Sequence, residues 1–248
     1  MTDEDIILLE SRKCHIELTS IKERSQFPAE WIKSLPSDTV CLLATRKQCH
    51  CLNTLISQEI SSDGITLIAE DSIDWRDIRL RNKAMEILET IEHDDRLSAG
   101  LAKQIVIKLG AKVMLRRNID VSLGLVNGTI AVVESVSESI MHGSDHVQKV
   151  NVMLQSGQTY SIKRMDVKFE IIDGAYITKR EFPISSSYGI TIHKSRGLSL
   201  RSAVMDLGNN EFSADHSYVT LSSVTTLDGV HLINFDPSSM KALPEARV

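Results

Sequence analysis

The chain has 248 residues, of which 42% are hydrophobic and 4% aromatic, and its formal net charge is −5. This length and hydrophobic content suit one large domain, or one domain with a smaller one inserted, and exclude wholesale disorder. No apolar run is long enough to cross a bilayer, and no charged-then-apolar leader opens the sequence. We therefore expect an intracellular protein without a signal peptide.

Charge is segregated along the chain. The balance is −7 over residues 1–99, +6 over 100–201 and −4 over 202–248. Within the basic third, the stretch from Lys103 to Arg117 holds five positive side chains and no acid. A phosphate backbone needs such a band, although a solvated edge would have the same composition.

The first third predicts alternating helices and strands. A helix with Thr2 as its cap opens the chain, and a short helix runs from Pro28 until Pro36 stops it. An apolar run over 39–45 predicts a buried strand that leads into a helix over 46–60. A further strand over 66–71 and an amphipathic helix over 78–91 complete an α/β layer with a largely parallel sheet.

The pattern changes after residue 104. Short β-rich segments follow one another, separated by Gly, Asn, Ser and Asp, with an exposed loop expected over 137–146. Such spacing is typical of a small β-barrel or meander. From Phe182 the α/β pattern returns, with strands over 202–208 and 230–235 and a helix over 216–224. The sequence predicts an α/β domain interrupted by a β-barrel insert.

Several kinds of site have no signature here. The dipeptide Gly-Lys is absent, so there is no phosphate-binding Walker loop, and no dinucleotide or nucleophile-elbow motif occurs. His193 and Ser195 alone do not make a hydrolase, and the acidic end of the 66–71 strand is best read as an ordinary turn. The cluster Cys49-His50-Cys51 could hold a metal, but no second ligand pair lies at suitable spacing, so we predict reduced thiols and no metal site.

The stretch SYGITIHKSRGLSL contains the densest polar cluster, at Thr191, His193, Lys194, Ser195, Arg196 and Gly197. A strand or short helix that gives way to a glycine-containing turn presents backbone N–H groups and hydroxyls suited to phosphate oxygens. A solvated helix end would use the same residue types. Residue types alone leave both interpretations open.

Three segments in order carry a resemblance: GAKVMLRRNIDVSLGLVNGTIAVV, then YGITIHKSRGLSL, then SYVTLSSVTTLDGVHLINF. Together they resemble the C-terminal half of the Pif-type (petite integration frequency) DNA helicases, superfamily-one motors that include Helitron transposon helicases. The resemblance runs from about residue 1 to 236. It implies an α/β fold in which a RecA-like parallel-sheet lobe, residues 1–112 and 179–248, is interrupted by a small Src-homology-like β-barrel insert, residues 113–178.

The resemblance also implies a function: one side of an ATP cleft and part of a single-stranded DNA site in a 5′–3′ motor. The implied cleft and coupling residues are Gly189, Thr191, Lys194, Arg196, Gly197, Tyr218 and Ser222. The implied DNA-binding residues are Thr45, Arg117, Asn118, Asn127, Thr191, His193, Lys194 and Ser195. For Asn127-Gly128, a tight hairpin turn is an equally good interpretation. Family roles in DNA repair, recombination and telomere maintenance, and a nuclear or else mitochondrial location, would follow.

Two departures from the family pattern weaken the expected chemistry. The position of the family's arginine finger is Ser223, and the usual glutamine of the His-Lys-Ser-Gln-Gly motif is Arg196. An arginine finger accelerates phosphoryl transfer roughly 10³–10⁵-fold, and serine cannot replace it. The family's first lobe, with its Walker loop, has no counterpart in residues 1–248. We expect no intact catalytic residue and no ATP hydrolysis by this chain alone, with ATP and Mg²⁺ bound only in a complete two-lobe motor.

Three functions remain to be separated. The first is a helicase second lobe that binds single-stranded DNA and works with a first RecA-like lobe, in cis or in trans. The second is a catalytically dead nucleic-acid-binding or protein-interaction module that has kept the fold. The third, an unrelated α/β binding protein, requires three ordered motifs to coincide by chance.

Overall fold

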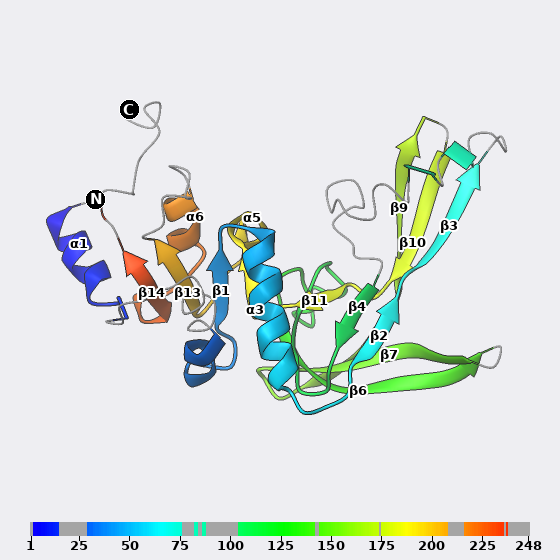
Figure 1. The fold of residues 1–248 in the computed structure, drawn as a ribbon, viewed down its shortest axis with the longest axis horizontal. Helices are drawn as coiled ribbons and strands as arrows, with labels where there is room; N and C mark the ends of the chain where they lie inside the picture. Colours follow the sequence, from blue (N-terminus) through cyan, green and yellow to red (C-terminus); the bar gives the residue numbers. More distant parts are fainter. Residues whose placement is uncertain are drawn as a thin grey trace.

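The computed structural model describes residues 2–14, 29–75, 82–83, 86–87, 104–141, 144–173, 175–207, 216–235 and 237. A four-stranded sheet with all strands parallel forms one end of the molecule (Figure 1). Its spatial order is β12 (Gly189–Thr191), β1 (Val40–Leu43), β13 (Ala203–Leu207) and β14 (Val230–Phe235). Its strands are short apolar runs because helices or other strands cover both faces. The predicted mixed α/β fold with a parallel sheet is confirmed.

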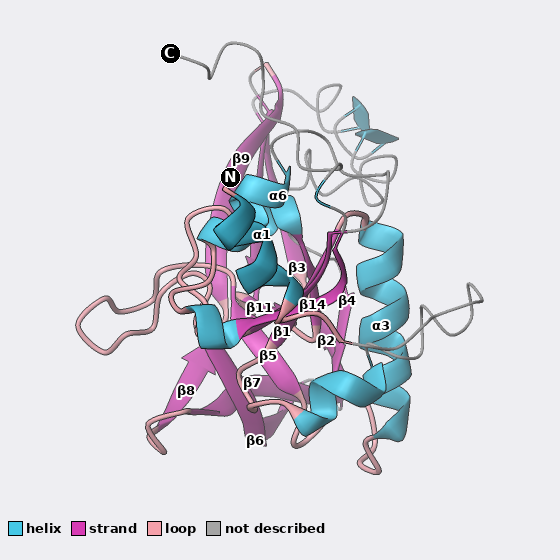
Figure 2. Ribbon diagram, turned by 90° about the vertical axis from the view of Figure 1, so that its left-hand side faces the viewer, coloured by secondary structure: helices cyan, strands magenta, loops and turns pink. Residues whose placement is uncertain are grey.

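Helices surround this sheet. They are α1 (Asp3–Glu10), α3 (Arg46–Glu59), α5 (Ile192–Ser195) and α6 (His216–Ser222), with a 3₁₀ turn η1 (Leu227–Gly229). Figure 2 shows α3 running its whole length along one flank of the strands. Thr2 caps α1 through a capping box, as expected. Residues 29–34 are helical too, whereas the predicted helix over 78–91 lies outside the described residues except at 82–83 and 86–87, which are helical.

The β-rich region forms three antiparallel sheets. Their strand orders are β11-β5-β6-β7-β8, β3-β10-β9 and β2-β4. The bounds are β2 (Ile65–Ile68), β3 (Glu70–Trp75), β4 (Gln104–Ile107), β5 (Lys112–Leu115), β6 (Ile130–Met141), β7 (Ser144–Leu154), β8 (Thr159–Lys163), β9 (Met165–Ile172), β10 (Ala175–Glu181) and β11 (Ile184–Ser186). The closed barrel and the domain bounds stay predictions.

Two local expectations were wrong. The strand expected over 66–71 does not join the parallel sheet, because β2 pairs antiparallel with β4. Leu67 is buried while Ile68 is 55% exposed, so β2 is covered on one face only. The loop expected over 137–146 is also wrong, since β6 and β7 pair out to Met141 and Ser144. A polar hairpin that is not covered by a core lacks the apolar alternation from which strands are predicted.

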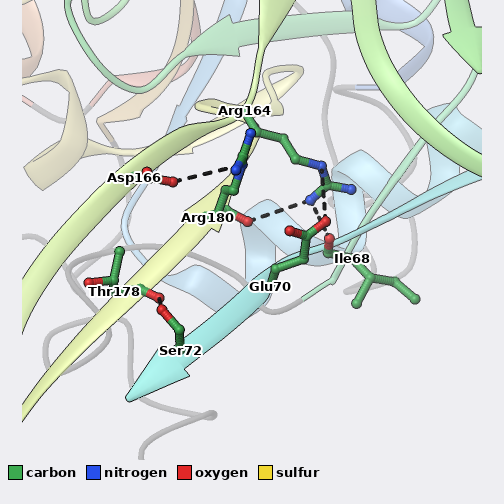
Figure 3. Close-up of polar contacts among 7 residues, drawn as sticks. All are labelled: Ile68, Glu70, Ser72, Arg164, Asp166, Thr178 and Arg180. Atoms are coloured by element: carbon green, nitrogen blue, oxygen red, sulfur yellow. Dashed lines mark hydrogen bonds and ion pairs between the residues drawn. The ribbon is translucent and has the colours of Figure 1, made fainter. Parts of the chain in front are cut away.

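Arg164 joins the three-stranded sheet to its neighbours. This residue lies between β8 and β9, and its Nη1 donates to the carbonyl oxygen of Ile68 at 2.5 Å and lies 3.5 Å from that of Arg180 (Figure 3). Its Nε is 3.8 Å from a Glu70 carboxylate oxygen, and its guanidinium lies 4.7 Å from the centre of the Phe182 ring. One side chain therefore binds the ends of β2 and β10, where β3, β9 and β10 extend away from the other sheets (Figure 1).

Strand β5 lies between two hydrophobic cores. Met114 packs with the parallel-sheet residues, whereas Val113 and Leu115 pack with the core of the five-stranded sheet. Lys112, on the same strand, is 7% exposed, and its Nζ donates to the Thr39 carbonyl oxygen at 2.7 Å. Burial lowers the pKa of Lys112 to about 8, and the nearby carboxylate of Asp38 opposes that shift. A buried ammonium group thus connects the two cores.

Lys112 predicts a pH-dependent stability. In the unfolded chain a lysine keeps its proton to about pH 10.4, whereas folded Lys112 loses its proton near pH 8. The unfolded state therefore binds more protons above pH 8, and stability rises with pH there. We expect wild type to gain stability relative to Lys112→Met between pH 7 and 9, by up to about 1 kcal/mol per pH unit. Urea unfolding at several pH values measures this, and a difference that stays constant over the range would contradict it.

Candidate nucleic-acid interface

Two of the predicted site residues, Thr45 and Lys194, lie at the carboxyl edge of the parallel sheet. Strands β1 and β12 are neighbours, and their last residues, Leu43 and Thr191, are register partners. Thr45 follows β1 by two residues, and Lys194 follows β12 by three. Both positions therefore lie at the same edge, which is where open α/β sheets bind their ligands.

Helix α3 begins at this edge and is fixed to β12. The Thr45 hydroxyl accepts from the Gln48 backbone N–H at 3.3 Å within a capping box, which leaves Thr45 exposed at the helix start. Further along, Asn53 donates to the Gly189 carbonyl at 3.0 Å and accepts from the Gly189 N–H at 2.8 Å. A Cβ at Gly189 would lie 3.1 Å from Leu52 and 3.3 Å from the Cys49 backbone, so the helix and the strand are in close contact.

A cleft of about 710 Å³ opens beside this joint. Helix α3 forms one wall, β4 with Lys108 and Arg116 forms another, and residues of β11 and β12 lie between them. Among the described residues, its charged lining consists of Arg46, Lys108, Arg116 and Lys194 with a single carboxylate, Glu181. The lining also carries the hydroxyls of Ser185, Ser186 and Thr191. The cleft therefore combines an excess of positive charge with hydrogen-bonding groups, as phosphate oxygens require.

The arginine-finger position faces the protein interior. Ser223 is 4% exposed, and its hydroxyl donates to the Val219 carbonyl at 2.7 Å. The same oxygen lies 3.3 Å from the hydroxyl of Ser195, which is fully buried and donates to the Ile192 carbonyl at 2.8 Å. The two serines thus join α5 to α6 through small buried hydroxyls.

Other predicted residues lie on the surface around α5 and α6. His193, Arg196, Gly197 and Ser222 are exposed, and Tyr218 is 76% exposed. Gly197 has φ +77, a conformation that favours glycine and turns the chain directly after α5. The predicted polar cluster is therefore divided, with Thr191 and Lys194 toward the cleft, Ser195 inside, and the rest facing solvent.

Two of the predicted residues in the loop after β5, Asn118 and Asn127, are hydrogen-bonded to each other. The Asn118 side-chain oxygen accepts from the Asn127 backbone N–H at 2.8 Å, so this pair closes the loop. Gly128 follows with φ +94, and a Cβ there would lie 2.2 Å from Leu198, just beyond the α5 turn. Arg117 lies next to the cleft residue Arg116. The structure therefore brings the loop beside the polar cluster and gives Asn118 and Asn127 a structural contact.

Sequence reasoning missed Arg46, Asn53 and the hydroxyls of β11. The sequence held a signal for Arg46, which adjoins the predicted Thr45. It also held one for the cleft residue Arg116, which belongs to the basic band from Lys103 to Arg117. Nothing in a helical Asn predicts that its amide will bind both backbone groups of a distant glycine.

Cys49, which lines the cleft, is held as a neutral thiol. Burial raises the pKa of Cys49 to about 12, an effect that the charge of Lys194 partly opposes. All four cysteines are free. Among the described residues, no group of three or more His, Cys, Asp or Glu side chains is arranged to hold a metal ion.

No described helix has the length and hydropathy needed to cross a bilayer.

Comparisons with known proteins agree with these features. A family model described as DNA helicase Pif1, 2B domain, matches residues 95–135. The ATP-dependent DNA helicase PIF1 of Xenopus laevis is 36% identical over 142 residues, which are 57% of this chain and 21% of that protein. This chain thus spans about a fifth of that relative.

Solved structures have the same fold. Pif1 from Bacteroides sp in complex with ADP-AlF4 matches 97% of this chain and 47% of its own, with a TM-score of 0.65 and 16% identity. Bacteroides Pif1 bound to single-stranded DNA matches 99% of this chain and 48% of its own, with a TM-score of 0.56 and 18% identity. The chain is related to the DNA helicases. Over part of its length its sequence is similar, more particularly, to those of Pif1-type DNA helicases.

The contact between Gly128 and Leu198 predicts a stability change. Gly128→Ala places a Cβ at positive φ and against Leu198, so we expect a loss of about 2–3 kcal/mol in the free energy of unfolding. Gly157→Ala is the matched control, because Gly157 has φ +80 and open space around it. Its loss should be smaller, about 1 kcal/mol. Chemical denaturation measures both, and equal losses would show that Leu198 moves away without cost.

Proposed function

We propose that this chain is the C-terminal motor half of a Pif-type ATP-dependent 5′–3′ DNA helicase. Its cleft at the carboxyl edge of β1 and β12 binds single-stranded DNA, and its exposed α5–α6 surface faces the nucleotide and a first RecA-like lobe. In this proposal residues 1–112 and 179–248 form the RecA-like lobe and 113–178 the barrel insert, and the protein works in the nucleus. The five-stranded sheet has a hydrophobic core of its own, distinct from the two that cover the parallel sheet, and this supports such an interrupted lobe.

The observation that carries this proposal is the convergence of Thr45, Arg46, Thr191 and Lys194 at one sheet edge, beside the cleft. Arg46 and Lys194 lie on the helices that follow the neighbouring parallel strands β1 and β12, so one phosphate backbone can reach both. The bound single strand in the Bacteroides structure supports the choice of ligand. ATP and Mg²⁺ belong to the complete motor, because no Walker loop occurs in residues 1–248.

DNA binding should depend on the cleft cations and on salt. We expect a labelled ten-residue oligo-dT to bind with a steep salt dependence, since each phosphate contact releases counterions. Arg46→Ala with Lys194→Ala should weaken binding about tenfold or more at 100 mM salt and reduce the slope of log K against log salt by roughly 1.4. Fluorescence anisotropy between 50 and 200 mM salt measures both quantities.

A matched control is Lys168→Glu, which lowers the net charge by the same two units from strand β9, remote from α3 (Figure 1). This variant should bind oligo-dT as wild type does. Equal weakening by the control and by the cleft double variant would show a general charge effect and would overturn the cleft as the binding site.

A second function is favoured by the burial of Ser223. A position whose side chain is hydrogen-bonded inside the protein cannot neutralise charge on a transferred phosphoryl group. The chain would then be a catalytically dead nucleic-acid-binding or protein-interaction module that keeps the helicase fold.

The two functions differ in their response to Ser223→Arg. We would join this chain to an intact first lobe from a Pif1-type relative and measure DNA-stimulated ATP hydrolysis. If the motor function holds, Ser223→Arg should raise the rate by about 10³-fold, whereas Ser223→Lys should raise it far less because its ammonium cannot form a bidentate contact. No gain with arginine, while oligo-dT binding and folding persist, would favour the module.

A further inference from the structure

The outer face of the five-stranded sheet carries an unusual pair of charges. Lys149 of β7 and Lys163 of β8 are register partners, so their side chains stand side by side on neighbouring strands. Lys163 is exposed and Lys149 is half-buried, while Val150 and Ile162 on the opposite face are buried in the core. Among the described residues, neither lysine has an ion-pair partner.

A like-charged pair directly across two strands destabilises a sheet. The overall charge of the chain is −5, so positive charge is not general on this protein. On the same face, Ser137 is the register partner of Lys149 on β6, and no carboxylate separates the two lysines. Glu138 pairs instead with Val147, a core residue, and so lies on the other face. An unneutralised cationic pair is held here at a cost in stability.

A polar row next to the lysines fixes their register. Asn151 Nδ2 donates to the Ser135 hydroxyl at 2.9 Å, and the Ser161 hydroxyl donates to Asn151 Oδ1 at 2.6 Å. These three residues are register partners across β6, β7 and β8, and on β7 and β8 they lie two residues away from the lysines, on the same face. These hydrogen bonds stabilise the register of the three strands, so the backbone positions that carry the two lysines are fixed relative to each other.

From this arrangement we propose that the face formed by Ser135, Ser137, Lys149, Asn151, Ser161 and Lys163 binds the phosphate backbone of duplex DNA. Paired ammonium groups complement phosphate charge, and the neighbouring serine and asparagine groups can bind phosphate or sugar oxygens. Unpaired strands bind through aromatic stacking, and these six residues include no aromatic ring. A duplex, whose bases are already stacked, fits this face better than a single strand does.

The proposal goes beyond the cleft function, because contact with a duplex on this face requires neither the cleft nor a nucleotide. It gives the chain two nucleic-acid surfaces of different kinds. The cleft would hold one strand, and the sheet face would hold a paired segment without reading its sequence.

The test compares two probes and two variants of the full 248-residue chain. The probes are a labelled 20-base-pair blunt duplex and a labelled ten-residue oligo-dT, followed by fluorescence anisotropy from 50 to 200 mM salt. Lys149→Gln with Lys163→Gln should weaken duplex binding about tenfold at 100 mM salt and reduce the salt slope by about 2, with oligo-dT binding unchanged. Lys168→Glu changes the net charge by the same amount from β9 and should leave both probes bound as in wild type.

The outcomes separate this proposal from the cleft. Duplex binding that is unaffected by the double variant, or reduced equally by Lys168→Glu, would overturn the sheet-face proposal and leave the cleft untouched. Duplex binding that depends on the lysines, without any oligo-dT binding, would support the sheet face and reject the cleft. Thermal unfolding checks folding: the double variant should melt at or above the wild-type temperature, because a like-charged pair has been removed.

Discussion

The architecture depends on strand β5 being buried on both sides. One side chain of this strand, Met114, completes the core over the parallel sheet, and its neighbours Val113 and Leu115 complete the core of the five-stranded sheet. Lys112 adds a hydrogen bond from its buried ammonium to the start of β1. The two cores therefore share one strand, and the wall of the cleft that holds Arg116 is fixed by the residues just before it.

The parallel sheet could be predicted because its strands are short apolar runs bounded by turn residues, as in the run over 39–45. The cap of α1 could be predicted equally well, since Thr2 stands directly before three acidic residues that suit the first turn of a helix. The outer part of the hairpin of β6 and β7 could not be predicted from the sequence. Its residues, such as Ser137 and Glu138, do not alternate between apolar and polar. Strand β2 was misplaced because a one-sided strand and a buried strand look alike over four residues.

The candidate site was predicted in part. The motif around Lys194 and the position of Thr45 came from the ordered resemblance, and the structure places both at one sheet edge. The same resemblance could not show that Ser195 and Ser223 are buried against each other, because burial depends on how α5 packs on α6. The Asn118–Asn127 contact was equally hidden, since it joins a side chain to a backbone group nine residues away.

The double hydrogen bond between Asn53 and Gly189 has a mechanical consequence. Strand β12 is an edge strand, and the amide of Asn53 occupies the groups that another strand would otherwise bind. Helix α3 and β12 are thereby clamped into one rigid piece that includes the helix start at Thr45. Any change in the width of the cleft must then come from the opposite wall, where β4 and Arg116 lie. The antiparallel sheets therefore determine how wide the cleft is.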